Sequence, residues 1–339
     1  MKQATLVIAE HNEGTQLNES LDNLFEYNDS SLFNVIVVSD GSEVELDLDK
    51  YGDMVKHVKK PIREGVGAAV DTGAEHVETP QMIIMGSDIR FRDKGCVKRM
   101  VYHLWNEENA KSLICTTNLG INLTAGKTIH SDKLLKRYGA KTLFFMTAED
   151  LPQKGSTMAR LKDDKAVSNY RNILEAKWLP KWDEGDIYAI PCILGAFYGV
   201  RTDWYRHIMG FQGHRYWGTL EPFISTKSWF AGGDCKIAVD IETGHLFKQR
   251  PSHITRPYDL LYNKIAISRI IFGREMADKF IEFLGTNPDM DIARELTGFD
   301  RQKINTLHER FAQVKTRDIH WFNERWPFKH YDLVKNKKD

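Results

Sequence analysis

Short apolar runs alternate with amphipathic stretches along the first part of the chain. Four runs rich in β-branched and aliphatic residues predict strands, at residues 4–9, 34–40, 81–85 and 112–117. Three polar stretches between them have helical periodicity: NEGTQLNESLDNLFEY, GAAVDTGAEHVE and KGCVKRMVYHLWNEE. Because strands and helices alternate, the pattern predicts an α/β fold, with a mostly parallel, Rossmann-like sheet covered by helices on both faces.

The rest of the chain follows three different patterns. From 118 to 185 the alternation disappears, and the sequence becomes polar, basic and irregular. Strand and turn signals return from 186 to 250, and the pattern becomes helical after Pro257. We therefore expect a main domain over residues 1–256, with an irregular insert at 118–185, and a helical extension over 257–339.

Polar loops follow three of the predicted strands: Glu10 follows the first, Asp40 the second, and Ser87-Asp88 the third. Ligands of parallel sheets bind beyond the carboxyl ends of the strands, so we expect these loops to form one site. Two interpretations remain open for the aspartates. Asp40 and Asp88 could be ordinary turn residues, or Asp40 could contact a nucleoside and Asp88 could bind a metal ion.

The charge balance changes this picture only locally. Lys and Arg together number 47, as do Asp and Glu, so the chain as a whole has no net charge that would attract nucleic acid or a membrane. Residues 127–181, however, contain twelve basic residues against six acidic ones. This excess is consistent with an anionic acceptor and also with a solvated lid.

Composition also bears on the compartment. No window approaches the roughly 18 to 20 apolar residues of a membrane-spanning helix, and the apolar stretch near the N-terminus is too short for a signal peptide. The cysteines are scattered without a Cys-x-x-Cys pair, so we interpret them as reduced core thiols: Cys96, Cys115, Cys192 and Cys235. The sequence predicts a cytoplasmic protein without a membrane span.

Short motifs in a fixed order resemble a known family. They are LVIAEHNEG, VIVVSDGSE, IREGVGAAVDTGAEHV, GSD, ILGAFYGVRTDWYRHIMGFQ, WGTLEPFISTKSWFAGG and TGHLFKQR. In this order they resemble the nucleotide-sugar glycosyltransferases of the GT-A fold, of the family 2 type, and especially the catalytic domain of polypeptide N-acetylgalactosaminyltransferases. The resemblance implies a GT-A catalytic domain over residues 1–256, with the insert as acceptor region or lid.

The resemblance also implies a donor and a cofactor. The donor would be a UDP-sugar and the cofactor Mn²⁺ or Mg²⁺, which oxygen and imidazole ligands suit. Asp88 and His245 match the metal-binding positions, although a lone histidine such as His245 is more often a packed residue. Trp217 would pack on the sugar, and Glu221 would orient a sugar hydroxyl or act as a base. The remaining donor contacts would be Glu10, Asp40, Arg63, Gly65, Ser87, Gly195 and Ala196.

Three departures from the family pattern qualify these assignments. Gly86 stands where the metal motif has its first acid, and Ser39 stands where the nucleobase loop has its first acid. Glu221 falls one residue later than the family's glutamate. The loss of two acids keeps open the alternative of a nucleotide-sugar-binding regulator without catalysis.

The acceptor follows from the sequence only as a set of hypotheses. The leading one is a hydroxymethylated pyrimidine base in DNA, bound through the basic segment 127–181, by analogy with the phage enzymes that glycosylate DNA bases. The alternative is a cytosolic transferase that acts on a saccharide, a lipid-linked intermediate or a protein. Whether the reaction retains or inverts the anomeric configuration also stays open.

Overall fold

The computed structural model describes four long stretches of the chain and several short pieces. The long stretches are residues 2–124, 183–246, 255–275 and 287–326. The short pieces are 127–129, 136–137, 139–141, 174, 176–179, 181, 277–278 and 281.

Four parallel strands form one half of the central sheet, in the order β3-β2-β1-β4. They are β1 (Ala4–Glu10), β2 (Phe33–Asp40), β3 (Val55–Lys60) and β4 (Gln81–Met85). Their apolar side chains face both sides of the sheet and are buried, as in strands covered by helices on both faces. Three of the four strands confirm the predicted runs, whereas β3 was not predicted.

The other half of the sheet mixes directions. β12 (Phe197–Arg201) runs antiparallel to both β4 and β6 (Ser112–Thr124), and β13 (Asp234–Leu246) runs parallel to β6. Two short strands pair antiparallel with β13: β5 (Ile89–Phe91) and β11 (Ile187–Ala189). Since β12 is antiparallel to both β4 and β6, the strands β6 and β13 run in the same direction as β1 to β4, and the mostly parallel sheet that the sequence predicts is confirmed.

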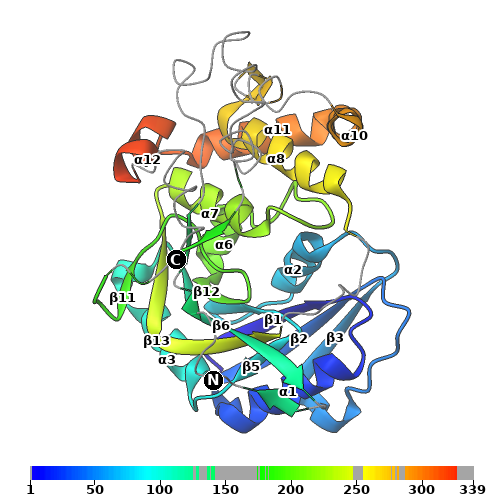
Figure 1. Ribbon diagram of the computed structural model, residues 1–339, viewed down its shortest axis with the longest axis vertical. Helices are drawn as coiled ribbons and strands as arrows, with labels where there is room; N and C mark the ends of the chain where they lie inside the picture. The colour runs from blue at the N-terminus through cyan, green and yellow to red at the C-terminus, as the bar shows by residue number, and fades with distance from the viewer. Residues whose placement is uncertain are drawn as a thin grey trace.

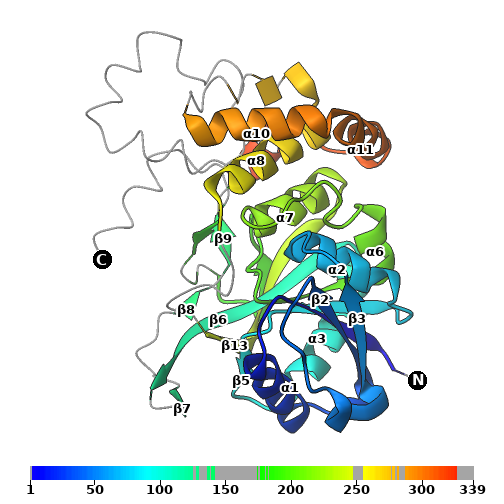
Figure 2. The same ribbon diagram turned by 90° about the vertical axis from the view of Figure 1, so that its right-hand side faces the viewer.

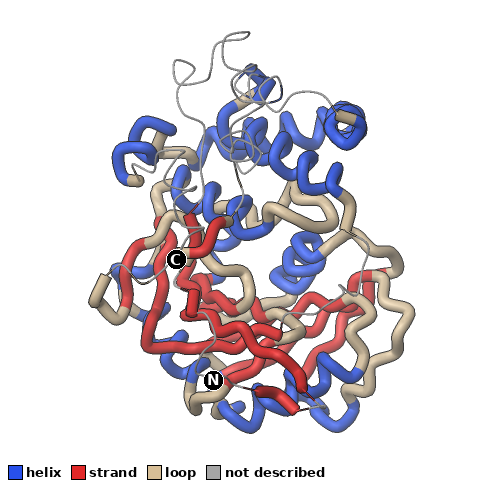
Figure 3. The backbone as a smooth tube through the Cα atoms, viewed as in Figure 1, coloured by secondary structure: helices blue, strands red, loops and turns tan. Residues whose placement is uncertain are grey.

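Helices cover both faces of the sheet, as Figures 1 and 3 show. One face carries α1 (Thr15–Tyr27) and α3 (Cys96–Trp105), whose apolar sides form one buried core with the sheet. The other face carries α2 (Val66–Glu75), α6 (Thr202–His207) and α7 (Leu220–Phe230), which contribute to a second core. Short 3₁₀ turns at Ser30–Leu32, Asp49–Met54 and Glu107–Asn109 complete the connections.

A second helical layer lies over α7, as Figure 2 shows from the side. Its helices are α8 (Pro257–Phe272), α10 (Pro288–Phe299), α11 (Arg301–Val314) and α12 (Ile319–Arg325). α8 packs against α7 on one side and against α10 and α11 on the other. This layer confirms the helical pattern expected after Pro257, and it belongs to the same buried core as α7.

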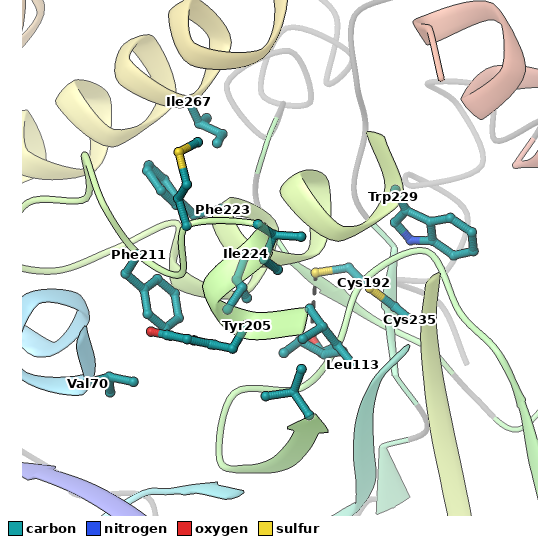
Figure 4. Close-up of a cluster of buried hydrophobic side chains, with 14 of the residues drawn as sticks. Val70, Leu113, Cys192, Tyr205, Phe211, Phe223, Ile224, Trp229, Cys235 and Ile267 are labelled. Atoms are coloured by element: carbon teal, nitrogen blue, oxygen red, sulfur yellow. Dashed lines mark hydrogen bonds between the residues drawn. The ribbon is translucent and has the colours of Figure 1, made fainter. Parts of the chain in front are cut away.

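α7 lies at the centre of the larger core, where it is buried around its whole circumference. Figure 4 shows Phe223, Ile224 and Trp229 among side chains from the sheet and from α8. Lys227 of the same helix is also fully buried, and its Nζ donates to the carbonyls of Gly210 and Gln212, both at 2.9 Å. Burial lowers the pKa of this ammonium group below its ordinary value.

The four cysteines are buried and unbridged, which confirms their interpretation as core thiols. Burial raises the pKa of the thiols of Cys96, Cys115, Cys192 and Cys235 above the ordinary value. Among the residues described here, no helix has both the length and the apolar character needed to cross a membrane.

Strand pairing extends into the segment expected to be irregular. β6 continues to Thr124. β13 pairs with it as far as Ile121, and β7 (Lys127–Ile129) pairs with its last three residues. The short strand β8 (Lys136–Arg137) also pairs with β6, and β9 (Ala140–Lys141) pairs with β10 (Lys177–Trp178). Most of the basic segment 127–181 lies outside the described residues.

Candidate functional site

A cavity of about 670 Å³ opens at the carboxyl ends of β1, β2 and β4. The loops that contain Glu10, Asp40 and Asp88 all line it, so the expected convergence of the three strand ends is observed. The residues assigned to the sugar and to catalysis enter from the other half of the sheet and from α7. Of all the site residues that the sequence proposed, only Gly65 does not line this cavity.

Asp88 and His245 meet on the wall of this cavity although they are far apart in the chain. Asp88 lies in the turn between β4 and β5, and the antiparallel pairing of β5 with β13 places His245 opposite Ile89. A backbone hydrogen bond from Leu246 N to the Asp88 carbonyl, at 3.0 Å, closes this arrangement. The imidazole Nε2 of His245 then lies 3.4 Å from Oδ1 of Asp88. Asp88 is thus a turn residue whose carboxylate also lies next to the His245 imidazole.

The site departs from the family pattern at Gly86, where the family has an acidic residue. A Cβ atom at residue 86 would lie 2.9 Å from Oδ1 of Asp88, so the carboxylate occupies the space that a side chain there would need. The backbone N–H of Gly86 donates to the carbonyl of Ala196 at 2.8 Å, which fixes the turn against β12. Residue 86 can therefore supply no ligand without displacing Asp88.

The Asp88–His245 pair fits two neighbouring ligands of a divalent ion. An oxygen and a nitrogen 3.4 Å apart can both reach one ion whose bonds are about 2.0–2.2 Å long. No cluster of three or more His, Cys, Asp or Glu side chains suited to a metal ion occurs in the part of the chain that the structure describes. If both side chains held such an ion, its other coordination positions would be open to a bound ligand and water.

Glu10 orders the first loop of the site. Its buried carboxylate accepts a hydrogen bond from the Ser42 hydroxyl at 2.7 Å and one from the backbone N–H of Glu13 at 3.3 Å. His11 Nδ1 lies 2.8 Å from the carbonyl of Asp40; since a carbonyl only accepts, this nitrogen carries the proton. The ends of β1 and β2 are therefore held together by the side chains that line the cavity.

Asp40 holds the loop that precedes α2. Its two carboxylate oxygens accept hydrogen bonds from the backbone N–H groups of Glu64 and Gly65, at 2.9 and 2.6 Å. The side chain is buried and also reaches the cavity. Ser39, which replaces the family's acid, instead pairs its hydroxyl with Nε2 of His57 at 2.8 Å. The predicted nucleoside contact of Asp40 stays a prediction, and its observed contacts place Arg63 beside the cavity.

Gly65 lies behind the cavity wall, where only glycine fits. Its φ of 103° and ψ of 164° belong to a region that side chains disfavour, and a Cβ atom there would lie 2.2 Å from the Tyr216 Cα. Backbone hydrogen bonds join the two loops on either side, from Tyr216 N to Glu64 O at 3.3 Å and from Val66 N to Tyr216 O at 3.2 Å. Gly65 thus joins the Arg63 loop to the Tyr216 loop.

We expect Gly65→Ala to lower the free energy of unfolding by at least about 1–3 kcal/mol, because the backbone conformation alone costs that much for alanine. Urea unfolding measures the difference. Gly298→Ala is the matched control, since a Cβ atom at residue 298 meets nothing within 4 Å. Equal stability of the Gly65→Ala protein and the wild type would contradict the role assigned to this glycine.

Glu221 reaches the cavity from the first turn of α7. A Cβ atom at residue 195 would lie 2.8 Å from Oε1 of Glu221, so the absence of a side chain at Gly195 makes room for the carboxyl group. Burial raises the pKa of this carboxyl, and hydrogen bonds from backbone N–H groups together with the nearby His245 imidazole offset part of that rise. Glu221 is therefore a titratable group next to the Asp88–His245 pair.

Trp217 stands at the mouth of the cavity with 42% of its surface exposed. The following glycine is held by His214, a buried histidine whose Nε2–H donates to the Gly218 carbonyl at 2.9 Å. Burial lowers the pKa of His214 to about 4, so the imidazole is neutral at pH 7. The neutral His214 ring therefore supports the loop that presents Trp217.

Acidification should destabilise the fold through His214. Its folded pKa of about 4 lies below the unfolded value of 6.5, so the unfolded chain binds more protons between these limits. The stabilising effect of His214 is complete above pH 6.5 and is lost as the pH falls toward 4. Urea unfolding at pH 7 and pH 5 should show this loss, and His214→Gln should reduce the difference between the two pH values. An unchanged pH dependence in His214→Gln would contradict the assignment.

The cavity is also lined by residues to which sequence reasoning assigned no role in this site, among them Asn118, Arg137 and Tyr216. Asn118 lies beyond the predicted end of its strand, and Arg137 entered only into a count of charges. Tyr216 directly precedes the Trp217 motif, which was the signal that could have identified it. Arg137 reaches the cavity because β8 pairs Arg137 with Asn118 of β6.

Comparison with known proteins gives a consistent classification. Residues 5–162 match the model of the family described as Glycosyl transferase family 2. The fold is GT-A, and the family match indicates a glycosyltransferase. A crystal structure of GalNAc-T7 with UDP, GalNAc and Mn²⁺ is similar at a TM-score of 0.70 and 15% sequence identity, over 98% of this chain. The chain described here spans 58% of the length of that GalNAc-T7 chain.

A second solved structure shares the fold. S. aureus TarS 1–349 in complex with UDP-GlcNAc has a TM-score of 0.50 and 12% identity, over 93% of this chain and 82% of the TarS chain. A comparison with curated protein sequences finds no match. The match to the family model ends at residue 162, before Gly195, Glu221 and His245. The fold nevertheless places these three residues in the lining of the cavity.

Proposed function

We propose that this glycosyltransferase moves a sugar from a nucleotide-sugar, a UDP-sugar, to a hydroxyl acceptor with the help of Mn²⁺ or Mg²⁺. The observation that carries the proposal is the Asp88–His245 pair, 3.4 Å apart on the wall of the cavity at the carboxyl ends of the strands. The solved structures with the same fold support the choice of donor and ion, since one is described with UDP and Mn²⁺ and another with UDP-GlcNAc.

The leaving group determines what the site must do. A nucleoside diphosphate gains negative charge as the glycosidic bond breaks, and a divalent ion held by Asp88 and His245 would neutralise it. Arg63 lines the same cavity and adds a fixed positive charge. Ser87, which is buried beside Asp88, would lie next to the diphosphate. Glu10 and Asp40 line the cavity at the ends of β1 and β2, where they would contact the nucleoside.

The sugar would lie between the ion and α7. The backbone of Gly195 and Ala196 lines this end of the cavity, and Trp217 would pack on the sugar ring. In this proposal Glu221 orients a sugar hydroxyl or accepts a proton from the acceptor. Burial raises the pKa of its carboxyl above the ordinary value, which is the direction that favours proton exchange by a general base.

A thermal-shift screen tests the donor assignment. We expect UDP and UDP-sugars to raise the melting temperature when Mn²⁺ is present, because a ligand that binds only the folded state stabilises it. Hydrolysis of the stabilising UDP-sugar then distinguishes an enzyme from a non-catalytic regulator. The absence of any nucleotide-dependent shift would overturn the proposed function.

For the acceptor, the proposal favours a hydroxymethylated pyrimidine base in DNA, and a saccharide, lipid-linked or protein hydroxyl is the alternative. The support is the excess of basic residues over 127–181, of which Arg137 lines the cavity. Lys136 beside it already pairs with Glu242. Salt-sensitive binding to duplex DNA, followed by mass spectrometry of the glycosylated product, separates the two acceptors. If the protein did not bind duplex DNA even at low salt, DNA would be excluded as the acceptor.

A further inference from the structure

The loop at residues 215–218 forms one rim of the cavity and has an unusual backbone. Tyr216 has a φ of 43°, and Thr219, directly after the loop, has a φ of 61°. Residues other than glycine adopt such values only where the surrounding structure holds them there. Tyr216, Trp217 and Gly218 all line the cavity. The conformation of this rim therefore depends on contacts from outside the loop.

Asn263 on α8 supplies the most extensive of these contacts. Its side chain is fully buried, and its Oδ1 accepts a hydrogen bond from the backbone N–H of Arg215 at 2.7 Å. Its Nδ2 lies 2.9 Å from the carbonyl of Arg215, 3.1 Å from that of Trp217 and 3.0 Å from that of Gly218. A single amide group thus contacts the backbone at Arg215, Trp217 and Gly218, with its two N–H groups shared among three carbonyls.

Two neighbours on α8 hold the same loop. The buried carboxylate of Asp259 lies 3.1 Å from Nε of Arg215, and the Arg215 guanidinium lies over the Tyr216 ring at 4.8 Å. On the other side, a Cβ atom at Gly218 would meet Leu260 at 3.0 Å, so the loop packs directly on the helix. Asp259 and Asn263 are one helical turn apart, which places both on the face of α8 that meets the loop.

We propose that α8 is a functional part of the donor site, in which Asn263 and Asp259 are positioning residues that set the conformation of the 215–218 loop for nucleotide-sugar binding. Neither residue lines the cavity itself. Both lie outside residues 5–162, where the family match ends. The inference rests on the proposed function for the identity of the ligand, whereas the contacts that carry it do not depend on that identity.

The 215–218 loop also contacts the loop that contains Arg63, on another part of the cavity wall. Tyr216 is joined by backbone hydrogen bonds to residues on either side of Gly65, and the Arg63 guanidinium lies 5.7 Å from the centre of the Tyr216 ring. Loss of the Asn263 amide removes this partner from the backbone N–H of Arg215 and from the carbonyls of Arg215 and Trp217, whereas the Gly218 carbonyl keeps the hydrogen bond from His214. The rim and the Arg63 side chain should then sample conformations that bind the donor poorly.

Calorimetric titration with UDP in the presence of Mn²⁺ tests the proposal. We expect Asn263→Ala to weaken UDP binding about 10- to 100-fold, the effect of losing one or two buried hydrogen bonds. Asn28→Ala is the matched control, because Asn28 is a buried asparagine that also ties down backbone, through Val97 N at 2.9 Å and Leu24 O at 3.1 Å. This control should lose stability and keep the affinity of the wild type.

The KM for the donor distinguishes a positioning role from a purely structural one, because a residue that only stabilises the fold would leave this KM unchanged. Asn263→Ala should raise the KM for UDP-sugar hydrolysis by more than it lowers kcat. If Asn263→Ala does not fold, Asp259→Asn replaces it, and we expect a several-fold loss of UDP affinity from the weakened contact with Arg215. Wild-type affinity in a folded variant of either residue overturns the inference. Absence of UDP binding by the wild type instead overturns the proposed function.

Discussion

Replacing Asp88 or His245 by alanine should abolish the metal dependence of UDP binding and lower sugar transfer on the order of 100-fold or more. The reason is geometric, since the two side chains are the pair that converges on the cavity wall, at 3.4 Å. The described residues offer no cluster of three or more metal-binding side chains, so loss of either member of the pair would leave the ion a single one of the two proposed ligands. UDP titrations of each variant with and without Mn²⁺ measure the effect.

A matched control exists on the molecular surface. His103 and Asp240 form another histidine–aspartate pair, 2.9 Å apart, and neither lines the cavity. His103→Ala should therefore keep metal-dependent UDP binding and transfer. If Asp88→Ala retained the wild-type response to Mn²⁺, the assignment of the metal ligands would be wrong.

Glu221→Gln should lower transfer about 10²- to 10⁴-fold, the range expected when a general base is removed. The pH dependence gives the sharper test. Burial raises the pKa of Glu221 above its ordinary value of 4.5, and a base acts only when deprotonated. Transfer by the wild type should therefore rise with pH through that raised pKa and then level off. The glutamine variant has no carboxyl group to titrate, so its residual activity should lack this rise.

The glutamine variant also separates catalysis from positioning. Glutamine preserves the shape of the side chain that fills the space beside Gly195. UDP affinity should therefore change little while transfer falls. An identical acidic limb in the pH profiles of Glu221→Gln and the wild type would show that another group titrates.

Hydrophobic periodicity predicted most of the sheet and its flanking helices, and it failed where burial removed the pattern. α7 has almost no amphipathic character because Pro222–Phe230 is buried throughout, and its aromatic and β-branched residues made it look like part of a strand-rich region. β3 was missed for the opposite reason. Its sequence VKHVKK carries three lysines and so lacks the apolar pattern of a buried strand, which a strand at the edge of a sheet does not need.

The site was predictable where its residues follow strand ends, as with Glu10, Asp40 and Asp88. The pairing of Asp88 with His245 came from the resemblance, and the structure explains it through the β5–β13 register. The contribution of α8 could not be predicted, because Asn263 carries no local motif and acts through backbone groups 45 to 48 residues away. Such contacts exist only once the fold has formed.

The central claim is that the cavity binds a nucleoside diphosphate through a divalent ion. A calorimetric titration of the wild-type protein with UDP, first after treatment with EDTA and then with Mn²⁺ restored, tests it most directly. We predict weak or unmeasurable binding in EDTA and strong binding once Mn²⁺ is present, since Asp88 and His245 would hold the ion and its charge would neutralise the diphosphate. Equal UDP affinity in both conditions, or no binding in either, would contradict the claim.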